Sequence, residues 1–497
     1  MPPEPDELAD GATSLRAVAM LDLLVELMAK AHGRGVYAEA RHVARDAELV
    51  RVRNGRVDSV EADASDGIGV RVRVGGAWGF AATRDATPAG AETALKRALA
   101  VAAAAPAAAS APLAPAPPAH GHWEAPCGRD PLAVSLEEKL ELLFAAEAPL
   151  RGDPRIVRAE SECRALHVRT SFASTEGAAC TQARTECGGA IQAMAADGQE
   201  LQVRSHPGSH GGSVVLGGWE HVLALDLPAH APRVRDEALA LLTAPPCPAG
   251  RRTIVLGGEQ LALQVHESIG HALELDRILL GEASYAGTSW VDPGDLGSLR
   301  YGSEHLHVTA DATLSGALGS FGWDDEGVAA RRTTLIADGV LRNALSDRQS
   351  AAAVGLHEPG GCARADGFAR QPIVRMTNVS LEPGAAGTLD ELIADTDDGL
   401  YLETNRSWSI DDRRLHFQFA TEIAREIRGG VLGPLMRNAS YAGLTPSFWG
   451  ALDAVCSRPA WQVWGVMNCG KGEPGQMMQV GHGTAPARFR DVEVGVA

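Results

Sequence analysis

Two proline-rich segments constrain the fold of this chain more than any other feature. Residues 103–120 are almost entirely alanine and proline, and residues 244–248 have the sequence Ala-Pro-Pro-Cys-Pro. Proline removes a backbone donor and breaks a helix, so both segments are typical of linkers. A chain of 497 residues also exceeds one ordinary domain. We therefore expect three regions, at residues 12–105, 119–243 and 249–497.

The N-terminal region shows two helical patterns with a sheet between them. Residues 14–31 and 91–103 carry apolar residues at helical spacing. Between them, alternating residues flank the pair Asn54-Gly55, which favours a tight hairpin because both residues tolerate positive φ. The pattern predicts a helix-sheet-helix domain.

The other two regions are also mixed. In the middle region, Ser135 and Glu138 match a capping box before an apolar helix, and alternation across residues 158–215 predicts several strands. Beyond residue 249, short strand patterns and glycine turns dominate, including a hairpin at Asp338-Gly339. The expected fold class is α+β, with an α+β middle region and a largely β C-terminal domain that carries the catalytic motif.

Charge and composition exclude several classes of protein. The net charge of −18 argues against a nucleic-acid binder, which usually presents a basic surface. The acidic N-terminal segment lacks the pattern of a secretory signal, and no apolar run approaches the ~18 residues of a membrane span. The eight cysteines include no CxxC pair, so we expect no disulfide framework. These features predict a cytoplasmic protein without a membrane or nucleic-acid partner.

The segment His266-Glu267-Ser268-Ile269-Gly270-His271 carries the strongest chemical pattern. Its histidines stand at i and i+5, so on a regular helix of ~100° per residue their side chains diverge by about 140°. They can share a metal only if a π-type bulge widens the helix or the helix ends near Gly270. The spacing therefore predicts an irregular backbone between Glu267 and His271.

Zinc chemistry suggests a role for each residue of this motif. Two neutral imidazoles would be ligands, and a catalytic site needs a third protein ligand and an open position for water. Zinc lowers the pKa of that water to about 7, and Glu267 could then take its proton as general base. Candidates for the third ligand are Glu274, Asp276 and the distant Cys469, which lies in a glycine-flanked segment beside Lys471 that we interpret as a turn favouring thiolate. Packing is the alternative role for a lone cysteine.

Three further polar features are weaker candidates. The cluster Asp324-Asp325-Glu326 could hold a cation or orient a substrate amine, although we prefer a turn cap that faces water. Glu274 and Asp276 could hydrogen-bond a metal-bound imidazole instead of binding the metal. His482 could polarise a substrate.

Four segments of the chain, in this order, resemble the TldD/PmbA family, also called modulator of DNA gyrase proteins. They are the glycine-containing strand segments at 55–57, 67–71 and 79–81, the motif at 266–271, the segment 319–327, and Asn468-Cys469-Gly470-Lys471. The similarity extends over most of the chain. Because both histidines and Glu267 are present, the chain is similar to the TldD-like members, whereas PmbA-like members lack the motif.

This resemblance implies a cytoplasmic zinc metalloprotease with one zinc ion per catalytic chain. Carried over by position, His266, His271 and Cys469 become the zinc ligands and Glu267 the catalytic acid/base. The resemblance also implies a homodimer, or a heterodimer with a PmbA-like chain, that encloses the site in a cavity. Unfolded peptides would be the substrates, bound as added β-strands at a sheet edge that the sequence does not identify.

The expected function is therefore zinc-dependent hydrolysis of peptide bonds in unfolded or extended polypeptides inside a dimer cavity. The alternative is a non-catalytic peptide-binding or regulatory subunit of a TldD/PmbA-type complex. The intact Glu267 favours the enzyme.

Overall fold

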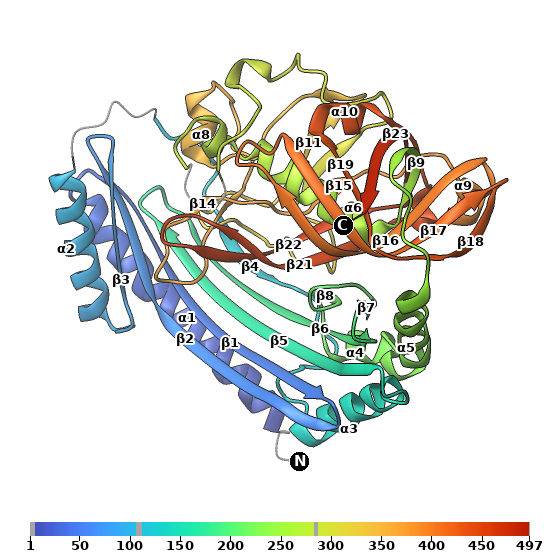
Figure 1. Cartoon of the computed structure of the whole chain (residues 1–497). Helices are drawn as coiled ribbons and strands as arrows, with labels where there is room; N and C mark the ends of the chain where they lie inside the picture. Colours follow the sequence, from blue (N-terminus) through green and yellow to red (C-terminus); the bar gives the residue numbers. More distant parts are fainter. Residues whose placement is uncertain (1–4, 106–111, 283–286, 497) are drawn as a thin grey trace.

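The computed structural model describes residues 5–105, 112–282 and 287–496. The fold is α+β with a β-rich C-terminal part, as the sequence predicts. Figure 1 shows a long curved sheet with helices α1 and α2 on one side and the C-terminal part of the chain on the other. Within the described residues, none of the helices combines the length and apolarity that a bilayer-spanning segment requires.

The first sheet has eight strands and contains both the N-terminal and the middle region. Its order is β3-β2-β1-β5-β6-β4, and β7 and β8 also pair with β6. The two regions meet where β1 pairs antiparallel with β5, from Glu39↔Ser174 to Arg53↔Glu160. The strands are β1 Tyr37–Arg53, β2 Arg56–Val74, β3 Ala77–Thr83, β4 His120–Glu124, β5 Ile156–Ser174, β6 Ala179–Ala196, β7 Leu201–His206 and β8 Ser213–Leu216.

Strands β1 and β2 form the hairpin that the pair Asn54-Gly55 predicts. Asn54 has a φ of 49° and Gly55 a φ of 74°, which is the left-handed conformation that both central residues of a type I′ turn need. The hairpin sets a register in which Glu39 lies opposite Arg71. Arg71 also binds Glu326 in the C-terminal part of the chain.

The predicted helices of the first two regions are confirmed, each longer than its apolar pattern. α1 and α2 pack against β1, β2, β3 and β5, whereas α3, α4 and α5 pack against β5, β6 and β7. Ser135 caps α3 by accepting a hydrogen bond from the backbone N of Glu138 at 3.2 Å. The Glu138 side chain binds Arg129 at 2.6 Å and does not complete the expected capping box. The helices are α1 Pro5–His32, α2 Pro88–Ala104, α3 Leu136–Glu147, α4 Trp219–Ala224 and α5 Leu227–Thr243.

The C-terminal part is built on two larger sheets. The seven-stranded sheet has the order β16-β9-β23-β19-β17-β18 with β20 beside β23, and the four-stranded sheet has the order β12-β11-β10-β15. β13 pairs with β14, and β21 pairs with β22. The strands are β9 Gly250–Leu256, β10 Val308–Asp311, β11 Arg332–Ala337, β12 Val340–Leu341, β13 Ala363–Arg364, β14 Ile373–Val374, β15 Val379–Leu381, β16 Asp398–Ile410, β17 His416–Arg428, β18 Val431–Met436, β19 Ala439–Leu444, β20 Leu452–Val455, β21 Gln462–Lys471, β22 Gln476–Thr484 and β23 Ala487–Val496.

Helix α6 lies on the aromatic core of this part. Tyr441, which stacks on Phe419 and Phe448, accepts a hydrogen bond from Gln260 at 2.8 Å and donates one to Gln264 at 3.1 Å. The core therefore fixes the rotation of α6 about its axis. The helices of this part are short: α6 Gly258–Val265, α7 Leu275–Ile278, α8 Arg348–Ala353, α9 Leu389–Ala394 and α10 Thr445–Gly450.

The proposed division into domains at residues 103–120 stays a prediction. Residues 106–111 of that segment lie outside the described residues, and on its two sides α2 ends at Ala104 and β4 begins at His120. Strands from both sides share the first sheet, whereas both large C-terminal sheets are built from strands that follow residue 249.

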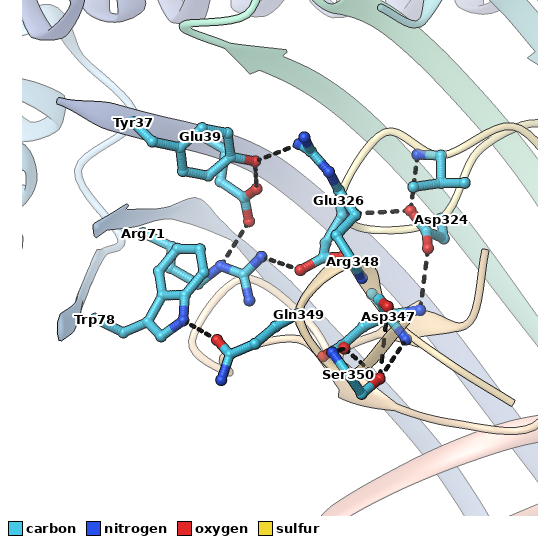
Figure 2. Close-up of polar contacts among 12 residues, drawn as sticks. Tyr37, Glu39, Arg71, Trp78, Asp324, Glu326, Asp347, Arg348, Gln349 and Ser350 are labelled. Atoms are coloured by element: carbon cyan, nitrogen blue, oxygen red, sulfur yellow. Dashed lines mark hydrogen bonds and ion pairs between the residues drawn. The ribbon is translucent and has the colours of Figure 1, made fainter. Parts of the chain in front are cut away.

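A buried charge network joins the first sheet to the C-terminal part (Figure 2). Arg71 on β2 donates from Nε to Glu39 on β1 at 2.7 Å and from Nη2 to Glu326 at 2.5 Å. Glu326 also accepts a hydrogen bond from the backbone N of Arg348, at the start of α8, at 2.9 Å. Although burial alone would lower the pKa of Arg71, Glu39 and Glu326 outweigh it and raise that pKa. The network therefore ties two distant parts of the chain with charged hydrogen bonds.

The cluster Asp324-Asp325-Glu326 caps a turn, but the expectation that it faces water is wrong. Asp324 accepts hydrogen bonds from the backbone N of Glu326 and Val328, both at 2.9 Å, and of Ala363 at 3.0 Å. Asp324 and Glu326 are 3% and 4% exposed. Arg71 of the first sheet binds Glu326 in this turn, and no local sequence pattern predicts this contact.

Candidate metal centre

The backbone between the two histidines is irregular, as their spacing predicts. α6 runs into a π-helical turn, His266–Gly270, and then into a 3₁₀ turn, His271–Leu273. The N–H of His271 bonds the carbonyl of His266, five residues back, which is the hydrogen bond of a π-helix. The wider turn brings both imidazoles to one side, with ring centroids 4.8 Å apart.

Hydrogen bonds of Ser268, Trp449 and Tyr301 hold this turn in place. Ser268 donates from its hydroxyl to the carbonyl of Gln264 at 2.6 Å and accepts a hydrogen bond from Trp449 Nε1 at 3.0 Å. The hydroxyl of Tyr301 donates to the carbonyl of Ser268 at 2.5 Å. The Ser268 carbonyl of the π turn is thus bonded by a buried hydroxyl.

Cys469 reaches the two histidines from the far end of the chain. Its Sγ lies 3.5 Å from Nε2 of His271, and one donor atom of each of His266, His271 and Cys469 lies within 4.8 Å of the other two. The ligands of a tetrahedral zinc ion lie about 3.5 Å apart, given bonds of ~2.0–2.3 Å, so small side-chain movements would close the set. The structure thus brings together the three residues that the family resemblance implies.

The sequence placed Cys469 in a turn beside an activating lysine, and both expectations are wrong. Cys469 lies within strand β21, paired with Met478 of β22. The Lys471 ammonium binds Asp276 at 2.7 and 2.8 Å and the carbonyl of Val374 at 2.6 Å. Asp276 is therefore engaged by Lys471 and does not join the donor cluster.

Two other side chains act on the thiol. Burial alone would raise the pKa of Cys469, but His271 and Arg375 outweigh it and lower that pKa to about 7. Arg375 Nη1 donates to the carbonyl of Gln476 at 3.2 Å, and Nη2 donates to the carbonyl of Cys469. The guanidinium is thereby fixed beside the strand that carries the thiol, which favours a thiolate at neutral pH.

The partners of both imidazoles leave their Nε2 atoms free to bind a metal. His271 Nδ1 lies 2.9 Å from Glu274 Oε2, so Nδ1 is assigned as the protonated nitrogen and donates to the carboxylate. His266 Nδ1 lies 2.8 Å from His482 Nε2, and His482 Nδ1 lies 2.7 Å from the carbonyl of Val379. Because a carbonyl can only accept, His482 donates to it from Nδ1, and its Nε2 accepts a hydrogen bond from His266 Nδ1–H.

Burial keeps these imidazoles neutral. Burial lowers the pKa of His266 to about 4, and it also lowers the pKa of His271. Although burial opposes its charge, Lys471, His271 and Arg277 hold the pKa of Glu274 well below its usual range. A neutral imidazole that donates its second N–H to a carboxylate is the usual arrangement of a metal-binding histidine. The prediction that Glu274 contacts an imidazole is confirmed, and His482 contacts His266.

Glu267 lies next to His266 and forms an ion pair that the sequence did not indicate. Its Oε2 accepts a hydrogen bond from Arg414 Nη1 at 2.6 Å. Arg414 lies in the connection between β16 and β17 with a φ of 63°, and burial lowers its pKa although Glu267 opposes this effect. The carboxylate thus has a fixed position beside the donor cluster.

An open pocket with a cavity volume of about 520 Å³ gives access to this cluster. His266, Glu267, His271, Arg414 and Cys469 all line it. A continuous run of β21, from Trp464 to Gly470, forms part of its wall. Two neutral imidazoles, an acidified thiol and an open side are the donor set and geometry that a catalytic zinc site needs, so the residues present fit that metal.

Comparison with known proteins assigns all three regions to one family. The PmbA/TldA metallopeptidase domain 1 matches residues 38–103, the central domain matches residues 129–242 and the C-terminal domain matches residues 249–496. The chain belongs to the PmbA/TldA metallopeptidase family. The family resemblance that the sequence motifs indicate is therefore confirmed.

Relatives of this PmbA/TldA metallopeptidase carry names of the same kind. A metalloprotease of Methanothermobacter thermautotrophicus is 31% identical over 95% of this chain and 98% of its own length. A zinc metalloprotease TldD homolog of Saccharolobus solfataricus is 27% identical over 50% of this chain and 52% of its own.

Solved structures share the fold. A Thermotoga maritima protein described as a modulator of DNA gyrase has a TM-score of 0.74 at 16% identity and covers 95% of this chain and 99% of its own. TldE from Thermococcus kodakarensis has a TM-score of 0.70 at 14% identity, and the match covers 92% of this chain and 96% of TldE.

Proposed function

We propose that this metallopeptidase holds one zinc ion through His266, His271 and Cys469 and hydrolyses peptide bonds with Glu267 as general acid/base. The observation that carries the proposal is the convergence of three donor atoms within 4.8 Å on the wall of a pocket that Glu267 also lines. When bound, the ion would polarise the scissile carbonyl and lower the pKa of water to about 7.

The residues around the cluster then have separate tasks. Glu267 takes the proton of the attacking water and later delivers it to the leaving amine. Arg414, 2.6 Å from Glu267, fixes the carboxylate and adds positive charge to the wall where the carbonyl oxygen becomes negative. Glu274 and His482 orient the two imidazoles through their Nδ1 atoms.

The substrate we propose is an unfolded or extended polypeptide. The seven consecutive residues of β21 on the pocket wall would offer backbone groups to an extended peptide whatever its side chains are. Enclosure of the pocket by a second subunit would exclude folded proteins. We propose that this subunit is either a second copy of the chain or a PmbA-like chain.

Metal content and cleavage of an unfolded, quenched fluorescent peptide test the proposal together. Wild type should contain one zinc ion per chain, and His266→Ala and Cys469→Ser should lose it. Glu267→Gln should keep the zinc and lose about 10²–10⁴-fold in kcat/KM, which is the usual contribution of a general acid/base.

Two results would count against catalysis by this site. If Glu267→Gln cleaves at the wild-type rate, Glu267 is not the acid/base. If the wild type binds zinc and the peptide but cleaves nothing, the chain is a non-catalytic peptide-binding subunit.

A further inference from the structure

A second pocket adjoins the proposed catalytic pocket. Its cavity is small, about 50 Å³, and lies between strands of the first sheet and the C-terminal part. Met477 of β22 lines both pockets. Three aspartates line the second pocket together with four arginines, which are Arg41, Arg45, Arg184 and Arg364.

Three of these arginines have carboxylate partners. Arg41 pairs with Asp325 at 3.2 Å, Arg45 pairs with Asp366, and Arg184 Nε lies 3.5 Å from a buried carboxylate oxygen of Glu186.

The remaining aspartate of the pocket does little to balance the fourth arginine. The Asp324 carboxyl oxygens accept hydrogen bonds from three backbone N–H groups. Burial, together with Glu326, raises the pKa of Asp324 well above the ordinary value. The carboxylates of this pocket therefore leave an excess of positive charge.

Arg364 is the arginine without a counter-ion. It is 3% exposed, its Nη1 donates to the carbonyl of Met376 at 2.8 Å, and its guanidinium lies 5.6 Å from the centroid of Phe321. Among the described residues, its buried Nη2 has no hydrogen-bond partner, and no carboxylate lies within ion-pair distance of it. Burial, Arg184 and Arg375 lower its pKa to about 9, although Asp325 and Glu186 oppose this effect from a greater distance, so it is still charged at neutral pH.

A buried charge without a counter-ion is unfavourable, and an anion in the pocket would remove that cost. The neighbouring aspartates would repel a doubly charged phosphate more than a single carboxylate. The planar guanidinium also matches a carboxylate with two parallel hydrogen bonds.

The pocket is also anchored next to the metal cluster. Met376, which accepts the hydrogen bond of Arg364, packs on the π turn, since a Cβ at Gly270 would lie 2.0 Å from its Sδ. We propose that Arg364, with Arg184, binds a carboxylate of the peptide substrate, either its C-terminal carboxylate or an Asp or Glu side chain. This inference rests on the proposed peptidase function.

Three forms of an unfolded peptide test it. They are the free acid, the C-terminal amide of the same sequence, and a series of amides in which one residue at a time is replaced by glutamate. Wild type should prefer at least one carboxylate-bearing form over the plain amide by about tenfold in kcat/KM and in Kd, as one charged hydrogen-bonded pair provides. Whether the free acid or a glutamate peptide is preferred identifies the source of the carboxylate.

The ratio between the preferred carboxylate-bearing peptide and the plain amide should fall to near one in Arg364→Gln and decrease in Arg184→Gln. It should keep its wild-type value in Arg251→Gln, which replaces an exposed arginine paired with Asp491. The ratio between peptides does not depend on how much of a variant is folded. Fluorescence anisotropy of labelled peptides measures it without turnover.

The two proposals fail differently in this experiment. Equal binding and equal cleavage of all three forms by the wild type overturn the carboxylate site and leave the peptidase standing. A binding preference that Arg364→Gln abolishes, without any cleavage by the wild type, supports the carboxylate site and overturns the peptidase. A preference that persists unchanged in both pocket variants also overturns the carboxylate site.

Discussion

Glu259 lies on the same face of α6 as His266, seven residues earlier and therefore about 10 Å away along the helix. Both residues line the large pocket. Its carboxylate accepts hydrogen bonds from the hydroxyl of Ser209 at 3.1 Å and from the backbone N of Asn405 at 3.0 Å. Burial, with a further contribution from Glu422, raises its pKa to about 7. This carboxyl group thus titrates near neutral pH inside the site.

The raised pKa makes the free energy of unfolding depend on pH. The folded chain keeps the proton of Glu259 up to about pH 7, whereas the unfolded chain releases it near the ordinary value of 4.5. The stabilising effect of this proton is complete below pH 4.5 and is lost as the pH rises through 7. Between pH 4.5 and 8, the free energy of unfolding of wild type should therefore fall by up to about 3 kcal/mol relative to that of Glu259→Gln.

Urea unfolding of the two proteins at pH 5 and pH 8 measures this difference. Glu61→Gln, at an exposed position of β2, serves as the control and should track the wild type. A constant difference between wild type and Glu259→Gln at both pH values would contradict the prediction.

At the scale of elements, the sequence predicted correctly those features that residues close together in the chain determine. The hairpin at Asn54-Gly55 and the cap at Ser135 follow from neighbouring residues, and both are correct. The π turn was predictable for another reason, since histidines at i and i+5 cannot share a metal on a regular α-helix. Local chemistry therefore sufficed for these three features.

Features that depend on distant pairs were not predictable. Arg414 and Arg375 carry no local pattern that marks them, and they reach Glu267 and Cys469 only through the tertiary fold. Lys471 adjoins the site in sequence, yet its ammonium binds Asp276. Proximity of Cys469 to the histidines came from resemblance to a family, because residues about 200 positions apart leave no spacing rule to apply.

The π turn makes Gly270 a sensitive position. A Cβ there would lie 2.0 Å from Met376 Sδ, so Gly270→Ala must displace the turn or the methionine. Overpacking of this kind typically costs about 1–3 kcal/mol, and we expect zinc affinity to fall with it. Thermal unfolding and zinc titration measure the two effects.

Gly294→Ala is the matched control, because a Cβ at that position meets nothing within 4 Å. Combining Gly270→Ala with Met376→Ala should restore part of the zinc affinity. Wild-type zinc affinity in Gly270→Ala alone would show that the turn has no role in metal binding.

At the scale of the molecule, the charge network around Arg71 fastens the C-terminal part to the first sheet. Removing one partner of a buried ion pair leaves the other charge uncompensated and costs about 3–5 kcal/mol. We expect this loss in Arg71→Met, because Glu39 and Glu326 would both lose their guanidinium. Urea unfolding followed by tryptophan fluorescence measures it.

The comparison variant is Arg16→Met, which removes an arginine that is 62% exposed and paired with Asp66. Exposed ion pairs contribute little to stability, so Arg16→Met should lower the free energy of unfolding by less than about 1 kcal/mol. Equal effects of the two substitutions would show that the network does not hold the two parts together.

The pairing of β1 with β5 has a consequence for any attempt to cut the chain. Severing the backbone between α2 and β4 would leave each fragment with a strand of more than fifteen residues whose hydrogen-bonding edge is bare. Such edges seek a partner strand and promote aggregation when none is present. The two pieces should be insoluble when produced separately and should reconstitute a folded protein when produced together.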